Sequence, residues 1–215
     1  PQGFPDKLAV LLGCALPTGL GLVFNELKPE QNKTIAVFGL GGIGMSALLA
    51  AKLFNPDKLI AVDVTEEKLA LAKQLGATHV VNASKVDAVQ AIAELTNNIG
   101  VDYSIEAGGT TRTIEQAFES VKDGGGQCVF ASHPANELKI QLEPHAFHRG
   151  KNIKGSWGGG SLPDKDIPIF AEHFAKGELP LEKLISKEYQ LDEVNIALDD
   201  LQQKKIVRAL IKITR

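Results

Sequence analysis

Short apolar runs alternate with amphipathic stretches along the first two thirds of the chain. The run Thr34–Phe38 is apolar without a break, which is typical of a strand covered on both faces. We expect four more strands, at Leu59–Val62, His79–Val81, Asp102–Glu106 and Gln127–Ala131. Helical patterns separate them, at Ile43–Phe54, Thr65–Gly76, Asp87–Thr96 and Thr111–Val121. This alternation with short loops predicts parallel strands joined by right-handed crossovers.

The rhythm changes after Pro134. Leu138–Leu142 alternates and predicts a half-buried strand, and Asn152–Ser156 predicts a sixth strand of the sheet. Three glycines, Gly158–Gly160, indicate a flexible joint. The last segments predict a helix-strand-helix-strand tail, at Ile167–Lys176, Leu184–Tyr189, Asp192–Gln203 and Arg208–Thr214. We therefore expect a doubly wound, six-stranded α/β domain over residues 1–157 and a tail over residues 158–215.

Two short helices are expected ahead of the sheet. Asp6 would cap a helix that runs to Leu12. Pro17 fits the first turn of a second helix, where its missing N–H costs nothing.

A glycine turn follows the first strand and opens the first crossover helix. Gly39 would allow the tight turn, Gly41 would let backbone approach a pyrophosphate, and Gly44 would let the helix pack closely on the strand. The free N–H groups at the start of the helix, at Gly42 and Ile43, would point at the anion. This strand-turn-helix context predicts a dinucleotide-binding (Rossmann) unit, and a glycine turn of another α/β protein is the alternative.

Asp63 ends the second strand about twenty residues after the glycines, the distance at which a carboxylate binds the ribose hydroxyls of a dinucleotide. Its negative charge would repel the additional phosphate of NADP, so we predict NAD. Lys68 lies in the first turn of the next helix, a poor place for a cation near the helix dipole. It either reaches the ribose or a phosphate, or is a surface lysine, just as Asp63 could be a solvated strand-end acid.

Composition narrows the class of protein. The chain has 215 residues, 44% hydrophobic and 23% charged, with a net charge of −3, as is usual for a globular protein. It has no basic run and no uninterrupted apolar stretch of about 18 residues, which argues against nucleic acid and against a membrane span. Its two cysteines, Cys14 and Cys128, lie far apart, which fits a reducing cytoplasm.

Several stretches together resemble the zinc-dependent alcohol dehydrogenases of the medium-chain dehydrogenase/reductase family. They are GCALPTG (Gly13–Gly19), VFGLGGIG (Val37–Gly44), the segment Ala61–Asn82 and the ending IVRALIKI (Ile206–Ile213). The resemblance runs in order along almost the whole chain. It implies transfer of a hydride from an alcohol to NAD, which gives an aldehyde or ketone.

The resemblance also implies roles for single residues. Cys14 would be a ligand of the catalytic zinc, whereas the residues alone indicate a small buried thiol at a helix junction. Thr18 would contact the nicotinamide, Lys68 the adenosine ribose and Arg208 the pyrophosphate. The backbone at the ends of the fifth and sixth strands would line the nicotinamide pocket, at Ala131, His133, Ser156 and Trp157.

The family places a catalytic domain before this region, with the other zinc ligands and the proton relay. We therefore expect the chain to be the cofactor-binding portion of a longer enzyme, with no catalytic residue of its own and a tail that packs on the missing domain. Relatives pair through the sheet edge expected at Leu138–Leu142 and Asn152–Ser156, which predicts a homodimer or homotetramer. The alternatives are a zinc-free quinone-type reductase and a non-catalytic nucleotide-binding module.

The histidines are weaker candidates. His145 and His148 are three residues apart and close to Glu143, a spacing that suggests a metal site but is more often a solvated helix face. His133 follows the fifth strand, where it would either touch the cofactor or cap a turn. We expect His79 and His173 to be structural.

Overall fold

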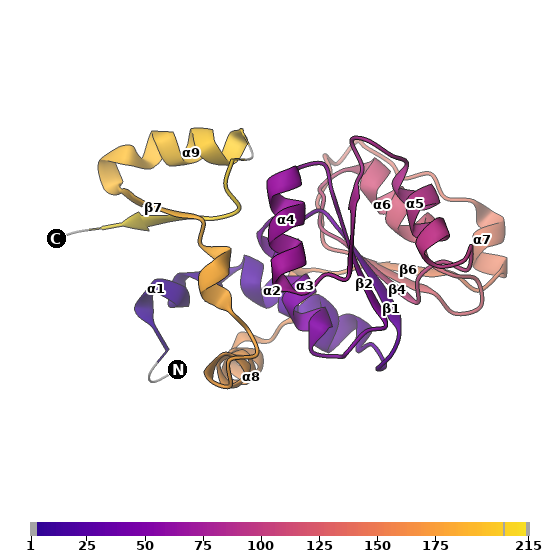
Figure 1. Cartoon of the computed structure of the whole chain (residues 1–215), viewed down its shortest axis with the longest axis horizontal. Helices are drawn as coiled ribbons and strands as arrows, with labels where there is room; N and C mark the ends of the chain where they lie inside the picture. Colours follow the sequence, from indigo (N-terminus) through magenta and orange to yellow (C-terminus); the bar gives the residue numbers. More distant parts are fainter. Residues whose placement is uncertain (1–3, 204, 214–215) are drawn as a thin grey trace.

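The computed structural model describes residues 4–203 and 205–213 (Figure 1). Its centre is a six-stranded parallel sheet with the order β3-β2-β1-β4-β5-β6. The strands are β1 (Thr34–Phe38), β2 (Lys58–Asp63), β3 (His79–Asn82), β4 (Tyr103–Glu106), β5 (Gln127–Phe130) and β6 (Asn152–Gly155). This confirms the predicted doubly wound α/β fold. The strand order reverses between β1 and β4, and such a reversal creates a crevice at the carboxyl ends of the strands.

Helices cover both faces of the sheet. The first face carries α2 (Ala15–Gly21), α3 (Gly42–Lys52) and α4 (Glu66–Leu75), and the second carries α5 (Ala88–Leu95) and α6 (Thr111–Glu119). Alternate residues of β1 serve the two cores: Ile35 and Val37 pack with the first set of helices, whereas Ala36 and Phe38 pack with the second. Burial on both faces explains the unbroken apolar pattern of this strand.

The leading segment is more broken than predicted. It comprises α1 (Asp6–Ala9), the 3₁₀ helix η1 (Val10–Gly13), α2, and the π-helix η2 (Leu22–Leu27). The prediction that Asp6 caps the first helix is wrong, because Pro5 holds the cap position and Asp6 is already helical. Pro17 lies in the first turn of α2, as predicted.

Within the described residues, no single helix is long and apolar enough to cross a membrane. The pair Asp6–Gly13 and Ala15–Leu27 reaches that length and composition only together, across a bend of 65°. All seven residues of α2 are buried against the rest of the protein.

The strand predicted at Leu138–Leu142 is wrong. This segment is irregular and leads into the short helix α7 (Pro144–His148). The place beside β5 is taken by β6, and the backbone N–H of Gln141 bonds instead to the carboxylate of Glu115 on α6, at 2.7 Å. Alternation of apolar residues therefore did not identify a strand here, because the segment pairs with no other strand.

The tail begins as part of the same core. The glycines predicted as a flexible joint form a tight turn, η3 (Gly158–Gly160), in which a Cβ on buried Gly159 would lie 2.2 Å from the carbonyl oxygen of Thr18. Phe170, on α8 (Pro163–Ala175), and Leu181, on η4 (Leu181–Leu184), join the core under α2 and α3. The joint is thus a packed contact with α2 rather than a loose linker.

The end of the tail forms a separate small layer. Strands β7 (Lys187–Gln190) and β8 (Ala209–Lys212) pair in parallel, joined by η5 (Leu191–Glu193) and α9 (Val194–Gln202). Figure 1 shows this yellow unit standing to one side of the main sheet. The predicted helix and final strand are present, although Thr214 lies outside the described residues. On α9, Ala197 is buried but Leu198 is exposed.

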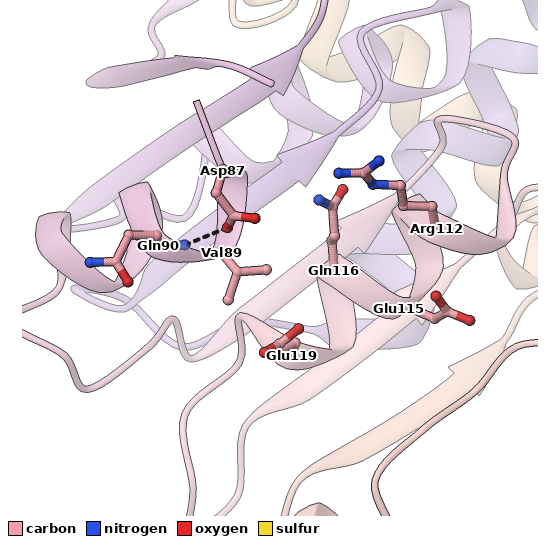
Figure 2. Close-up of a pocket in the computed structure, with 7 residues that line it drawn as sticks. All are labelled: Asp87, Val89, Gln90, Arg112, Glu115, Gln116 and Glu119. Carbon is pink, nitrogen blue, oxygen red and sulfur yellow. Dashed lines mark hydrogen bonds between the residues drawn. The ribbon is translucent and has the colours of Figure 1, made fainter. Parts of the chain in front are cut away.

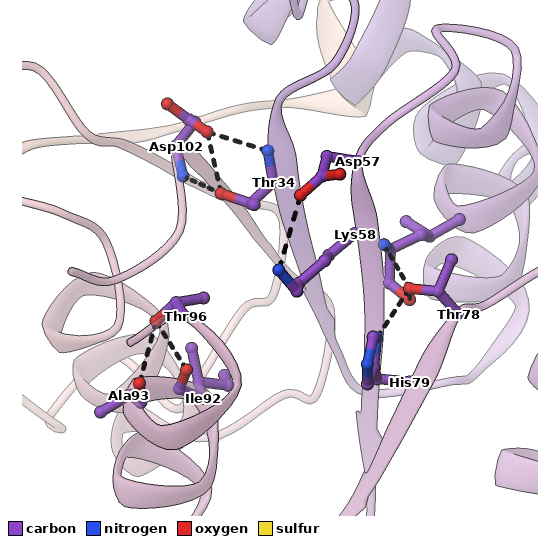
Figure 3. A network of polar contacts seen from close by, with 10 residues as sticks. Thr34, Asp57, Lys58, Thr78, His79, Ile92, Ala93, Thr96 and Asp102 are labelled. Carbon is purple, nitrogen blue, oxygen red and sulfur yellow. Dashed lines mark hydrogen bonds and ion pairs between the residues drawn. The ribbon is translucent and has the colours of Figure 1, made fainter. Parts of the chain in front are cut away.

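Polar contacts join the central strands at their amino ends, away from the crevice (Figure 3). Thr34 donates from its N–H and from its hydroxyl to Oδ2 of Asp102, both at 2.8 Å, and accepts the N–H of Asp102 at 2.9 Å. The ammonium of Lys122 lies 2.6 Å from Oδ1 of Asp102. Burial by itself would raise the pKa of the Asp102 carboxyl, but Lys122 and Thr34 together lower it below the ordinary value of 3.8. These contacts join the starts of β1 and β4 directly below the crevice.

We expect Asp102→Asn to lower the free energy of unfolding at neutral pH by about 1–3 kcal/mol, since it removes charge-assisted bonds to Thr34 and Lys122. A carboxyl whose pKa is lowered in the folded state stabilises above its unfolded pKa, near 3.8, and loses this effect as the pH falls through the folded pKa. The difference from the unchanged chain should therefore shrink in acid. Urea unfolding at neutral and acidic pH measures it.

Asp57→Asn is the matched control, because this carboxylate is 62% exposed and lies 3.5 Å from the Lys58 ammonium beside it. Little change is expected there, as for most surface ion pairs. An equal loss of stability in the two variants would contradict a special role for Asp102.

Candidate functional site

The glycine turn between β1 and α3 leaves no room for two side chains. Gly39 has φ +83°, and a Cβ there would meet the backbone of Gly108 at 2.4 Å. A Cβ on Gly44 would lie 1.8 Å from the carbonyl oxygen of Gly39. The turn therefore requires glycine at both positions, and it sets the start of α3 directly against the end of β1.

The first turn of α3 faces open space and a cation. A Cβ on Gly41 would have no heavy atom within 4 Å, so this backbone is accessible. Gly42 and Ile43 begin the helix, where N–H groups have no partner within the helix. Near them lies the guanidinium of Arg208, since a Cβ on Gly42 would be 2.6 Å from one of its nitrogens. Helix N-terminus and arginine together form a cradle for an anion.

Asp63 braces this turn as well as facing the crevice. Its Oδ2 accepts the N–H of Leu40 at 2.7 Å, and its Oδ1 accepts the N–H groups of Val64 and Thr65 at 2.8 and 3.0 Å. Thr65 occupies the cap position of α4 as expected, but its side chain makes no capping bond. A carboxylate has about four acceptor sites, so Asp63 retains acceptor capacity for a ligand.

A cavity of about 430 Å³ lies beside Asp63, over the ends of β1, β2 and β4. It is large enough for the adenosine end of a dinucleotide. Half-buried Lys68 lies on its wall, which leaves the ribose-binding role open to it. Its other polar lining residues come from the loop after β4 and from α6, namely Thr110, Arg112, Thr113 and Gln116. No local pattern in the sequence indicates these residues, because only the packing of α6 across the sheet brings them to the crevice.

A second hollow, of about 440 Å³, lies between α5 and α6 (Figure 2). Its walls are polar, and it shares Arg112 and Gln116 with the first cavity. Asp87 is engaged there as the cap of α5, accepting the N–H of Gln90 at 2.9 Å. This hollow lies on the outer side of the helices and is not lined by the glycine turn, so we place the candidate site in the first cavity.

Cys14 and Thr18 flank the other side of the glycine turn. Cys14 is exposed at the junction of η1 and α2, so the interpretation as a buried thiol is wrong. Thr18 is buried in α2, where its carbonyl contacts the turn at Gly159. A Cβ on Gly19 would lie 2.3 Å from the carbonyl oxygen of Ile43, so α2 packs on the first turn of α3.

The ends of β5 and β6 lie beyond β4, on the side of the sheet away from β2. Ala131 is buried, and the exposed His133 ring packs edge-on against Trp157 with ring centroids 4.9 Å apart. Trp157 is 85% exposed. Buried Ser156 follows β6 and donates its hydroxyl to Glu26.

Glu26 is held at this place by the π-helix η2, an element that often marks functional sites. Its carboxylate accepts from Ser156 at 2.6 Å and lies 2.6 Å from the Lys154 ammonium. Burial by itself would raise the pKa of Glu26, but the Lys154 and Ser156 contacts lower it below its ordinary value. The arrangement fixes the Ser156 side chain directly after β6.

Glu106 is a residue that the sequence analysis missed. It ends β4 fully buried, and its carboxylate accepts four hydrogen bonds from neighbouring segments. An acid at the end of a buried strand was the available signal, since Asp63 ends β2 in the same way. The other buried titratable group nearby, the Cys128 thiol, has its pKa raised to about 12 by burial, so it stays protonated and unreactive.

The remaining histidines form no metal site among residues 4–203 and 205–213. His145 and His148 are exposed on α7, and the nearby Glu143 carboxylate pairs with Arg149 at 3.0 Å. In this described part of the chain, no three His, Cys, Asp or Glu side chains come together in a way that could hold a metal ion. Cys14 therefore stands as a single candidate ligand.

The two histidines expected to be structural make local contacts. His79 contacts the Thr78 hydroxyl at 2.9 Å, and His173 contacts Phe24 and Glu178.

Comparison with known proteins finds relatives along the whole chain. Alcohol dehydrogenase 1 of Pisum sativum is 35% identical over 99% of this chain, and the alcohol dehydrogenase of Malus domestica is 36% identical over the same share. The chain spans 56% of the length of each.

Solved structures agree with these relatives. Benzyl alcohol dehydrogenase from Acinetobacter calcoaceticus superposes with a TM-score of 0.94 at 34% identity, covering 100% of this chain and 59% of that one. An alcohol dehydrogenase zinc-binding domain protein from Burkholderia ambifaria gives the same TM-score at 32% identity, covering 100% and 58%. The family model described as zinc-binding dehydrogenase matches residues 42–176. With the glycine turn, Asp63 and the crevice in place, this chain belongs to the zinc-binding dehydrogenase family.

Proposed function

We propose that the chain binds NAD and serves, within a longer polypeptide, as the cofactor-binding part of a zinc-dependent alcohol dehydrogenase. The observation that carries this proposal is the Asp63 carboxylate, which borders the same cavity as the accessible backbone of Gly41. The Asp63 carboxylate selects an unphosphorylated ribose, and the backbone of Gly41 leaves room for a pyrophosphate. The names of the relatives support alcohols as the substrate class.

The residues of the chain divide the work of holding the dinucleotide. The N–H groups at Gly41 and Gly42 and the Arg208 guanidinium hold the pyrophosphate, while Asp63 and Lys68 hold the adenosine ribose. When bound, NAD supplies the hydride acceptor on its nicotinamide ring.

The other half of the crevice orients that ring and limits its contact with water. Thr18 does so from α2, and the ends of β5 and β6 contribute Ala131, His133, Ser156 and Trp157. Such orientation is the main contribution of a protein to hydride transfer.

Zinc would be held by Cys14 together with residues that this chain does not supply. The exposed thiol at the start of α2 has the chemistry of a zinc ligand, and zinc in such an enzyme supplies a Lewis acid for the alcohol oxygen. The tail, with exposed Leu198 on α9, would pack against the domain that carries the other ligands.

We also propose assembly as a homodimer or homotetramer through β6. Its neighbour in the sheet is β5 alone, so its other edge has free backbone groups. Exposed Leu138 and Phe147 lie on the segments before it. The cysteines, Cys14 and Cys128, are both free thiols, which favours a cytoplasmic location.

A zinc-free quinone-type reductase is the alternative enzyme, and a non-catalytic nucleotide-binding module is the alternative outside enzymes. Titration of the chain with NADH, followed by fluorescence, tests the binding on which all three depend. Alcohol oxidation and metal content of the longer protein then separate them. NADH binding without alcohol oxidation or zinc would exclude the proposed activity.

Two glycine variants should separate binding from folding. Gly41→Ala should fold with unchanged stability, because its Cβ meets no atom and φ is −78°, yet its methyl group projects where the pyrophosphate would lie. We expect the NADH Kd to rise by about tenfold or more, which corresponds to about 1.4 kcal/mol. Fluorescence titration measures the Kd, and thermal unfolding without ligand measures the stability.

Gly44→Ala should instead destabilise the chain by about 1–3 kcal/mol or more, because its Cβ overlaps the Gly39 carbonyl oxygen. If Gly41→Ala binds NADH as well as the unchanged chain does, the proposed pyrophosphate position is wrong.

Asp63→Asn should reduce the preference for NADH over NADPH. The amide oxygen can still accept the N–H of Leu40, but the NH₂ group cannot accept from Val64 and Thr65, and the charge that favours ribose hydroxyls and repels a phosphate is lost. We expect the NADH Kd to rise by about 10- to 100-fold, from about 1.5–3 kcal/mol per charge-assisted bond, and the NADPH Kd to change less. Parallel titrations with both nucleotides give the ratio. Asp57→Asn, just before the amino end of β2, should leave the ratio of the two Kd values unchanged. An unaltered ratio in Asp63→Asn would refute NAD selection by Asp63.

A further inference from the structure

A fully buried carboxylate lies between the two halves of the crevice. Glu106 ends β4, the strand at which the order of the sheet reverses. Burying a charge is costly unless hydrogen bonds compensate for it. In this chain the bonds to Glu106 come from three different segments: the loop after β4 and α6, which line the cavity beside Asp63, and the loop after β5.

One oxygen serves the adenosine half. Oε1 accepts the N–H of Gly108 at 2.7 Å, the N–H of Gly109 at 3.1 Å and the hydroxyl of Thr113 at 2.7 Å. Gly108 and Thr113 line the cavity beside Asp63. Gly108 is also the residue against which the Gly39 backbone is packed. The carboxylate thus fixes the wall that faces the glycine turn.

The other oxygen serves the nicotinamide half. The hydroxyl of Ser132 donates to Oε2, and the N–H of Ala131 donates to the backbone carbonyl of Glu106 at 3.0 Å. Ser132 immediately precedes His133, whose ring packs on Trp157. This single side-chain bond therefore ties the loop after β5 to the residue that positions the adenosine wall.

We propose that Glu106 is a positioning residue that sets the two halves of the dinucleotide site relative to each other, through Oε1 for the adenosine half and through Ser132 for the nicotinamide half. This inference rests on the proposed NAD binding. Glu106 is fully buried and is not among the residues that line the cavity, so it acts through its neighbours, and its effect is expected to be larger on binding of the whole dinucleotide than on binding of the adenosine half alone.

Ser132→Ala removes only the bond between Glu106 and the loop after β5, on the nicotinamide side. We expect the Kd for NADH to rise by about 3- to 30-fold, less than the full strength of a bond to a charged group because Ser132 acts on binding only through position, while the Kd for AMP stays within about twofold. NADH is followed by fluorescence and AMP by calorimetry. Ser120→Ala is the matched control, since the Ser120 hydroxyl likewise donates one bond, to the carbonyl of Gln116 at 2.8 Å, at the far end of α6. It should change neither Kd.

Glu106→Gln removes the charge but keeps the shape. Its amide oxygen can accept from Gly108 and Gly109, and its NH₂ group can donate to Ser132, so we expect the chain to fold and both ligands to bind more weakly. In this background Ser132→Ala should have a smaller effect on NADH, because Glu106→Gln has already replaced the charge-assisted bond to Ser132 by a weaker neutral one. A purely structural role would instead give additive effects and equal losses for NADH and AMP.

The possible failures can be told apart. If the unchanged chain does not bind NADH, the proposed function fails and this inference with it. If the unchanged chain binds NADH and Ser132→Ala binds it equally well, the inference alone is overturned. Should Glu106→Gln not fold, Ser132→Ala with its Ser120→Ala control decides the question.

Discussion

The backbone contact between Gly39 and Gly44 is the constraint on which the site depends. With a Cβ of residue 44 only 1.8 Å from the Gly39 carbonyl oxygen, α3 can start directly at the end of β1 only if that Cβ is absent. Asp63 then secures the turn from the neighbouring strand through the N–H of Leu40. The helix N-terminus is thereby fixed at the crevice between β1 and β4, and the anion cradle follows from this one close approach.

Two acids, the half-buried Asp102 and the fully buried Glu106, hold the sheet at the two ends of its central strands. At the amino ends of the strands Asp102 joins the starts of β1 and β4 through Thr34. At the carboxyl ends of the strands Glu106 joins the segments after β4 and β5 through bonds to Gly108 and Ser132. A carboxylate is suited to both places because it accepts several donors at once, whereas an amide or hydroxyl accepts fewer. The crevice is therefore defined by polar contacts at its ends and by apolar packing along its strands.

The tail supplies Arg208, the cation of the candidate anion cradle at the first turn of α3. Its first part is packed into the core, as buried Phe170 shows, and its end returns β8 to the side of β7. This return places Arg208 over Gly42, at the first turn of α3. The tail thus brings Arg208 to the candidate anion cradle, and its first half is buried whereas α9 exposes apolar residues.

The sequence by itself determined the strands of the main sheet, their parallel direction, the glycine turn and Asp63. Period, length and glycine spacing are local properties of the chain. The sequence failed at Leu138–Leu142, where the same alternation occurs without a partner strand, and at Gly158–Gly160, where glycine meant close packing rather than flexibility. Only the tertiary structure decided that Arg208 lies at Gly42, that Arg112 lines the cavity and that Glu106 links both halves of the crevice. These are contacts between segments far apart in the chain, and no local pattern encodes which distant groups a folded sheet brings together.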